Sequence, residues 1–250
     1  MKKGKIILII LVVGLLGLLT LLAFLRPSGP SQNKNVPKSY YRQKGTSEQM
    51  KKYVAGTLLE ATKQADLDRV KKLLTNSTAQ VDEVDHENNT ALAIAVQKND
   101  VQIAKVLIDH GANINYQNKI SDSPYLYAGA QGRTEILAYM LEHSQPDEQI
   151  HNRFGGNALI PAAEKGHIDN VRLLLADGRE NINHQNNFGY TALIEAVALR
   201  DGSETYQEIV RILLENGADQ SIRDNDGKTA LDYANQYNYV ALRALLIAYQ

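Results

Sequence analysis

The chain has 250 residues, of which 44% are hydrophobic and 22% charged, and it contains no cysteine. This length and composition allow a packed domain and exclude a disordered or collagen-like protein. Without cysteine, disulfide frameworks, thiolate zinc sites, iron–sulfur clusters and cysteine nucleophiles are excluded. The formal net charge of −1 is unevenly distributed along the chain, because residues 1–52 hold ten Lys or Arg and a single acid, Glu48. The remainder is therefore acidic, and we do not expect it to bind nucleic acid.

A long apolar run follows the first basic residues. Residues 1–5 form a short basic tail, and residues 6–25 are apolar except for two glycines and Thr20. About 20 apolar residues match the length that crosses a hydrocarbon core, and a buried core helix would show a polar stripe. A cleaved secretory signal has a shorter apolar core and a small-x-small site, which Ala23–Pro27 does not offer. We therefore expect an uncleaved transmembrane helix at residues 6–25, with secretion after cleavage as the alternative.

The next segment, residues 26–52, is predicted to be a flexible basic stalk. Up to residue 50 it holds three prolines and very few apolar residues, so it cannot bury a core. Basic residues flank the apolar run on both sides, so the positive-inside rule does not decide the orientation. A very short charged tail usually stays in the cytoplasm. We expect a single-pass protein whose following domain is extracytoplasmic, and the alternative places that domain in the cytoplasm.

A motif of six residues recurs through the rest of the chain. Its copies read TALAIA, SPYLYA, NALIPA, TALIEA and TALDYA, and they begin 33, 34, 34 and 38 residues apart at Thr90, Ser123, Asn157, Thr191 and Thr229. A string rich in Leu, Ile and Val follows, and in three copies it ends at a glycine: Gly111, Gly178 and Gly217. Self-similarity at this period indicates a repeat architecture, in which each unit buries its apolar face against the next.

On these motifs, the sequence resembles the ankyrin repeat family over residues 53–250. The resemblance implies an all-α solenoid in which each repeat supplies a helix-turn-helix and a hairpin loop. We expect an N-terminal cap at about 53–85, a C-terminal cap at about 225–250, and repeats at about 86–117, 118–152, 153–186 and 187–224. The resemblance also implies protein binding as the usual activity and no cofactor.

Each unit has a physical explanation. The Thr, Ser or Asn that opens the motif can cap the inner helix, and the alanine that closes it lets neighbouring inner helices stack closely. The glycine can end the second helix in a left-handed conformation. Two copies depart from this pattern. Counting the N-terminal cap as the first unit, the third unit has Ser144–Asp147 where others have Gly-Ala-Asp. The fifth unit carries about five extra residues near Gly202, which we expect to lengthen the turn between its helices.

No motif with catalytic spacing occurs in the sequence. Phosphate-binding, dinucleotide-binding and nucleophile-elbow patterns are missing. Three histidines lie near predicted helix ends and two in hairpin regions: His110, His143, His167, His151 and His184. The acid-rich run Asp82–Glu87 has neither Ca-loop spacing nor a turn glycine, so we interpret it as solvated charge. We therefore predict no catalytic residue, metal site, cofactor or small-molecule substrate.

One row of equivalent positions differs from the others, because repeat register turns sequence spacing into a line in space. The position just before the hairpin glycine, or its substitute, is apolar in the central repeats and acidic at both ends: Glu87, Ile120, Phe154, Phe188 and Asp226. Tyr190 adds an aromatic residue beside Phe188. Aromatic anchors on a polar edge are typical of a protein-binding hot spot. The alternative is that Ile120, Phe154 and Phe188 pack against neighbouring hairpins and stiffen the row.

Polar residues are expected to surround this row. The same alignment places them on hairpin tips and at the ends of inner helices, where they form a rim of mixed charge: Lys119, Arg153, Asn187, Gln97, Lys98, Gln131, Glu164 and Lys165. A mixed rim is typical of a specific interface rather than a charge-driven one. The row, Tyr190 and the rim together are the predicted protein-binding site.

The chain is therefore interpreted as a non-catalytic scaffold, tethered to a membrane, that binds a partner protein through its hairpin tips and concave face. A Lys-rich start without an organelle signal suggests the bacterial envelope. A second hypothesis is structural or chaperone-like support of an envelope enzyme. Enzymatic activity of the solenoid itself is the remote third hypothesis.

Overall fold

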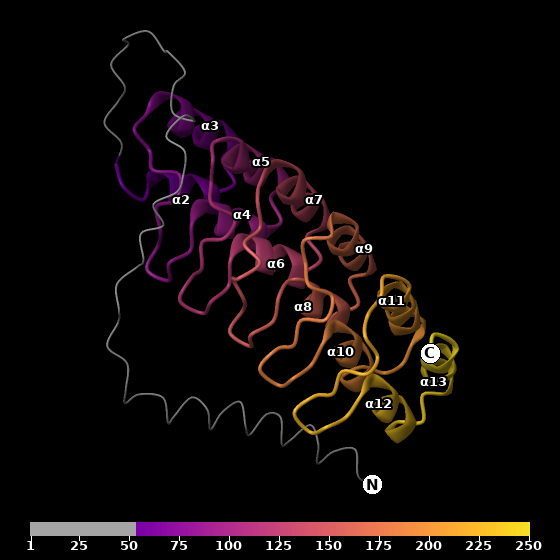
Figure 1. The fold of residues 1–250 in the computed structure, drawn as a ribbon. Coiled ribbons are helices and arrows are strands. Elements are labelled where there is room, and N and C mark those ends of the chain that lie inside the picture. Colours follow the sequence, from indigo (N-terminus) through magenta and orange to yellow (C-terminus); the bar gives the residue numbers. More distant parts are fainter. Residues whose placement is uncertain (1–53) are drawn as a thin grey trace, which may run out of the picture. The chain divides into compact units, whose positions relative to one another are not determined.

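The computed structural model describes residues 54–250, and within them the chain forms twelve helices arranged as six pairs (Figure 1). The first helices of the pairs form an inner row: α2 (Thr57–Lys63), α4 (Ala91–Lys98), α6 (Pro124–Ala130), α8 (Leu159–Glu164), α10 (Ala192–Ala198) and α12 (Ala230–Gln236). The second helices form an outer row: α3 (Leu67–Asn76), α5 (Val101–Asp109), α7 (Thr134–His143), α9 (Ile168–Asp177), α11 (Glu204–Glu215) and α13 (Val240–Ala248). Hairpin loops join successive pairs and project from one side of the inner row. The predicted all-α solenoid is confirmed.

Each helix pair packs mainly against its two neighbours. Helix α4 contacts α2, α5 and α6, and this pattern repeats along both rows. The inner helices can approach closely because the alanine that closes each motif is completely buried: Ala95, Ala128, Ala162, Ala196 and Ala234. Larger side chains of the outer helices are equally buried: Leu107, Leu137, Leu174 and Leu213. The core is therefore one continuous apolar layer along the repeats.

Hydroxyl side chains begin four of the inner helices, as predicted. Each occupies the N-cap and accepts a hydrogen bond from the backbone N–H three residues later: Thr90, Ser123, Thr191 and Thr229. At Asn157 the prediction needs a correction, because helix α8 begins only at Leu159 and Ala158 takes its N-cap position. Asn157 Oδ1 nevertheless accepts from the Ile160 N–H at 3.2 Å. The capping group is the predicted one, and the helix starts one residue later.

The ends of the outer helices confirm the prediction for the glycines. Gly111, Gly178 and Gly217 have φ angles of +83°, +74° and +83°, in the left-handed region that ends helices. Helix α7 of the third repeat ends differently, with Ser144 in an extended conformation. The extra residues of the fifth repeat lie in the turn between α10 and α11, as expected.

The predictions for residues 1–5, 6–25 and 26–52 fall outside the described residues. Among residues 54–250, no helix combines the length and the apolar character needed to cross a membrane. The transmembrane helix and the basic stalk therefore stay predictions.

Candidate functional site

An Asp or Asn side chain builds the turn of each hairpin. Asn186 is representative, since its Oδ1 accepts hydrogen bonds from the backbone N–H groups of Phe188 and Tyr190 at 2.9 and 3.0 Å. The same two contacts occur in all five hairpins between the described helix pairs, at Asp85, Asn118, Asn152, Asn186 and Asp224. This local bonding is what makes Asp and Asn favourable in turns.

Sequence reasoning overlooked these turn residues, although they recur at the same spacings of 33, 34, 34 and 38 residues as the helix motif. Asp85 belongs to the acid-rich run that we interpret from the sequence as solvated charge, and that interpretation is wrong for this residue. Its side chain is 11% exposed and holds the first hairpin turn. Asp82 in the same acid-rich run accepts a hydrogen bond from the Asn113 N–H at 2.8 Å.

These turns place the row at the hairpin tips. The residue that follows each row position has a positive φ: Asn88, Ser121, Gly155, Gly189 and Gly227. Backbone hydrogen bonds tie neighbouring tips together, since the Asn187 N–H donates to Phe154 O at 2.9 Å and the Asn225 N–H donates to Phe188 O at 3.1 Å. The central residues Ile120, Phe154 and Phe188, called here the hairpin-tip row, are 52%, 47% and 54% exposed.

Aromatic rings continue from the hairpin-tip row onto the inner helices. The ring centroids of Phe154 and Phe188 lie 6.4 Å apart, those of Phe188 and Tyr190 6.3 Å, and those of Tyr190 and Tyr233 6.2 Å. These distances are typical of interacting aromatic pairs. Packing between hairpins therefore accounts for only part of each phenylalanine surface, because about half of each side chain faces solvent.

Cations of the chain itself stack on the first and the last of these four rings, and ring contacts continue from Tyr233 to Tyr237. The Arg153 guanidinium lies 4.6 Å from the centre of the Phe154 ring, and Lys228 Nζ lies 5.0 Å from that of Tyr233. Between them, no Lys or Arg of residues 54–250 stacks on Phe188 or Tyr190. Phe188, which is 54% exposed, can therefore be reached by a cation from elsewhere.

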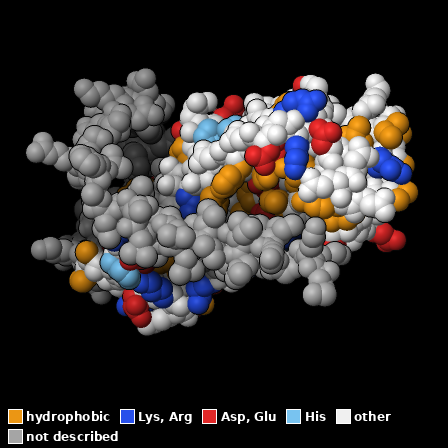
Figure 2. Space-filling view, turned by 90° about the horizontal axis from the view of Figure 1, so that it is seen from below, with side chains coloured by type: hydrophobic (Ala, Val, Ile, Leu, Met, Phe, Trp, Pro, Cys, Tyr) orange, Lys and Arg blue, Asp and Glu red, His pale blue; other side chains and the backbone are white. Residues whose placement is uncertain are grey.

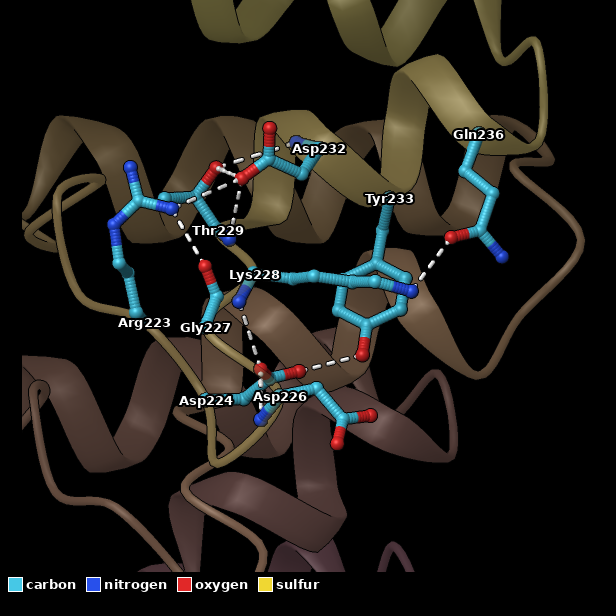
Figure 3. A network of polar contacts seen from close by, with 9 residues as sticks. All are labelled: Arg223, Asp224, Asp226, Gly227, Lys228, Thr229, Asp232, Tyr233 and Gln236. Atoms are coloured by element: carbon cyan, nitrogen blue, oxygen red, sulfur yellow. Dashed lines mark hydrogen bonds and ion pairs between the residues drawn. The ribbon is translucent and has the colours of Figure 1, made fainter.

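The last hairpin fixes one end of this surface through a polar network (Figure 3). Asp224 is 7% exposed, and its Oδ2 accepts a hydrogen bond from the Tyr233 hydroxyl at 2.5 Å while its Oδ1 holds the turn. Lys228 Nζ crosses the Tyr233 ring and donates to Gln236 Oε1 at 2.8 Å. Burial and the hydrogen bond with Asp224 raise the pKa of Tyr233, so its phenol remains a donor.

Glu195 is a buried carboxylic acid in the inner row. It occupies the fifth position of the repeated motif in α10, where the other copies have Ile94, Tyr127, Pro161 and Tyr233. Its side chain lies among buried residues, and the residue is 7% exposed. Asn186 Nδ2 donates to Glu195 Oε1 at 2.7 Å. The side chain that builds the Phe188 hairpin turn therefore also anchors this acid.

The charge of Glu195 is only weakly compensated. Arg200 forms its ion pair with Glu164. Burial, followed by the negative charge of Glu164, raises the pKa of Glu195 to about 8, against the opposing effects of Asn186 and Arg200. A glutamate in this position is protonated through much of the physiological pH range.

The predicted rim residues lie around this surface with few contacts to one another. Lys119 Nζ is 3.9 Å from Glu87 Oε1, and Arg153 Nη1 is 3.7 Å from Asp122 Oδ2. The others are exposed or half-buried on hairpin tips and at inner-helix ends: Asn187, Gln97, Lys98, Gln131, Glu164 and Lys165. On the described part of the face in Figure 2, hydrophobic side chains lie beside both basic and acidic ones.

The histidines have local partners. His110 Nδ1 lies 2.7 Å from Val106 O, and His143 Nδ1 lies 3.0 Å from Tyr139 O. The rings of His151 and His184 stack with their centroids 4.3 Å apart. No group of three or more His, Cys, Asp or Glu among residues 54–250 is placed to hold a metal ion.

Comparison with known families identifies the class of this fold. A family model described as ankyrin repeats in three copies matches residues 58–150, 126–224 and 179–250. These matches span most of the chain, and the chain belongs to the ankyrin repeat family. Ankyrin repeats are in general non-enzymatic modules for protein–protein interaction.

Individual relatives agree with this assignment. The chain is 37% identical to the ankyrin repeat protein YahD of Escherichia coli (strain K12) over 190 residues, which cover 76% of this chain and 94% of YahD. The crystal structure of the ankyrin repeat protein EF0377 superposes with a TM-score of 0.78 at 67% identity, covering 79% of this chain and all of that one. An ankyrin repeat domain from Acinetobacter baumannii AYE gives a TM-score of 0.75 at 42% identity, over 78% of this chain and 98% of its own.

The solved relative also bears on how much of the chain is needed to fold. The crystallised EF0377 chain matches 79% of the 250 residues, and residues 54–250 make up the same share of the chain. Independent folding of the repeat region stays a prediction, which the chain beginning at Lys51 tests.

Proposed function

We propose that this protein is a non-catalytic scaffold that binds a partner protein through its hairpin-tip row and the adjoining ends of its inner helices. The observation that carries the proposal is the exposure of Ile120, Phe154 and Phe188, which are about half exposed and aligned by hydrogen bonds between hairpins. Exposed aromatic residues in a row, surrounded by polar side chains, have the composition of an interface hot spot. The mixed charge of the rim adds specificity rather than strong general attraction.

Replacing both phenylalanines tests this surface directly. We expect Phe154→Ser with Phe188→Ser to abolish capture of the partner protein, measured by quantitative mass spectrometry of proteins retained on the immobilised chain. The melting temperature should change little, because both rings are already about half exposed. Ile247→Ser is the matched control, since Ile247 is 53% exposed on α13. A large loss of melting temperature with capture intact would instead support a packing role for the row.

We further propose that residues 6–25 hold the protein in a membrane and that the repeat domain lies outside the cytoplasm, in a bacterial envelope. The apolar run and the basic tail before it support this topology. Protease treatment of intact spheroplasts and of lysed cells tests it. Cleavage of the repeat domain in spheroplasts supports the proposed side, and protection until lysis would place the domain in the cytoplasm.

A further inference from the structure

The proposed protein-binding surface contains a buried acid, Glu195, that forms no ion pair with a Lys or Arg of residues 54–250. Glu195 Oε1 accepts from Asn186, whereas no hydrogen bond to Oε2 occurs within residues 54–250. Within the described residues this oxygen therefore has no donor, and the residue as a whole is 7% exposed.

The groups that face Glu195 come from three neighbouring elements. Glu164 at the end of α8 adds a second negative charge. Arg200 after α10 pairs with Glu164 through Nη2, its charge acts against the raised pKa of Glu195, and its buried Nε has no hydrogen-bond partner within the described residues. Asn186 on the hairpin supplies a neutral amide. Among residues 54–250, the one hydrogen bond to the Glu195 carboxyl comes from this neutral amide, and the residue is 7% exposed. A cationic donor would stabilise its ionised form, because charge-assisted hydrogen bonds are strong where solvent is excluded.

The surroundings indicate which kind of cation would fit. Asn186 joins Glu195 to the turn of Phe188 and Tyr190, the two rings of the series on which no cation of the described residues stacks. Arg153 on Phe154 and Lys228 on Tyr233 show that rings of this series accept cationic side chains. A metal ion needs several oxygen ligands, and of the two carboxylates here Glu164 is occupied by Arg200.

The net charge of the whole repeat region also favours a cationic partner. Residues 53–250 carry a formal charge of about −10, because ten of the 27 Lys and Arg residues but only one of the 28 acids lie before them. A field of this sign favours the approach of a basic partner.

We propose, on the basis of the proposed function, that a Lys or Arg side chain of the partner protein pairs with Glu195 while an adjacent apolar residue of the partner contacts Phe188. The long stem of a basic side chain can lie along an aromatic ring while its charged end reaches the carboxylate. Glu195 is then the specificity-determining residue of the interface. The other copies of the motif have apolar or aromatic residues at this position and cannot replace it.

The proposal makes the interaction depend on pH in a defined direction. Glu195 must lose its proton to pair with a cation, and its pKa is about 8 in the absence of a partner. Because apparent affinity scales with the competent fraction, it should rise by about 25-fold from pH 6.5 to pH 8.5. Replacing Glu195 by glutamine should remove this rise.

The test uses the full chain in a mild detergent and a library of random twelve-residue peptides displayed on phage. Peptides selected at pH 8.5 are screened against Phe188→Ser, and one that loses binding is taken as the hairpin-tip ligand. Each Lys or Arg of that peptide is then replaced in turn, Arg by citrulline and Lys by norleucine. Dissociation constants are measured for the wild type, Glu195→Gln and the control Glu142→Gln, which removes an exposed carboxylate from α7.

We expect one peptide replacement to weaken binding to the wild type at least tenfold, and Glu195→Gln to weaken binding of the original peptide equally. The peptide replacement and Glu195→Gln together should weaken binding no more than either change alone. Glu142→Gln should leave the dissociation constant unchanged. Phe188-dependent peptides that bind Glu195→Gln as well as the wild type would overturn this inference and leave the proposed function standing. Failure to obtain any Phe188-dependent peptide would overturn both.

Discussion

The buried acid in the inner row makes a prediction about stability that needs no partner. Glu195→Gln keeps the size and the acceptor that Asn186 uses, and it removes the possibility of ionisation. We expect the variant to match the wild type in acid and to be more stable in base. The perturbation therefore isolates the free energy of placing one negative charge at this site.

The magnitude follows from the pKa. The ordinary pKa of the glutamate is 4.5 and that of Glu195 is about 8, so folding favours the neutral form. Its contribution to stability is complete below pH 4.5 and is lost as the pH rises through 8. Between pH 5 and pH 8.5 the wild type should lose about 4 kcal/mol relative to Glu195→Gln, taking about 1.4 kcal/mol per unit of pKa. For a domain of about 200 residues, this corresponds to roughly 8–15 °C in melting temperature.

Thermal unfolding followed by far-ultraviolet circular dichroism measures this difference on the chain beginning at Lys51. Midpoints are compared at pH 5, 7 and 8.5 for the wild type, Glu195→Gln and the control Glu142→Gln. Glu164→Gln adds a second check, because it removes the nearby charge that raises the pKa of Glu195 and frees Arg200. That variant should show a smaller pH dependence than the wild type. Parallel profiles for the wild type and Glu195→Gln would refute the assignment of an uncompensated acid.

Three further expectations concern the hairpins and the domain boundary. Gly189→Ala should destabilise the domain at least twice as much as Gly178→Ala in urea unfolding. Both glycines have a positive φ, and the backbone strain of an alanine there costs about 1–2 kcal/mol at either position. Only at Gly189 would the added Cβ also meet backbone atoms, at 2.7 Å. Asn186→Asp should lower the free energy of unfolding by about 1–3 kcal/mol at pH 7, since it replaces the amide beside the buried acid by a carboxylate. Asn152→Asp should lower it by under about 1 kcal/mol, because aspartate forms the same turn in the last hairpin. Equal losses of stability in the two variants would contradict this explanation. The chain beginning at Lys51 should be soluble and unfold cooperatively, and aggregation at neutral pH would count against independent folding.

The fold could be predicted because the signals that define it are local and repeated. A cap such as Thr191 forms its hydrogen bond within three residues of sequence, and a glycine such as Gly178 ends its helix by its own backbone conformation. Repetition at 33 to 38 residues then implies stacking. Where one signal weakened, as at Asn157, the helix boundary shifted by one residue.

The exposed row could be placed from repeat register, but its surroundings could not. The contact between Asn186 and Glu195 spans nine residues and requires the hairpin to fold back onto the inner helix. In the next repeat, the equivalent pair is Asp224 and Tyr233, with the donor and the acceptor exchanged. Such complementary pairs depend on the geometry of two elements at once, and no pattern within one element reveals them.

Glu195 is the position where local rules are broken most clearly. A buried acid replaces the apolar or aromatic residue of the other repeats. This acid lowers stability at neutral and basic pH, because ionising it in its buried position costs free energy. Sites that break consistency between local preference and fold are where function is expected. The two experiments on Glu195→Gln are therefore linked, because a variant that is more stable yet binds less tightly is the result that a functional acid produces. If the acid served only the fold, the same substitution would leave binding unchanged.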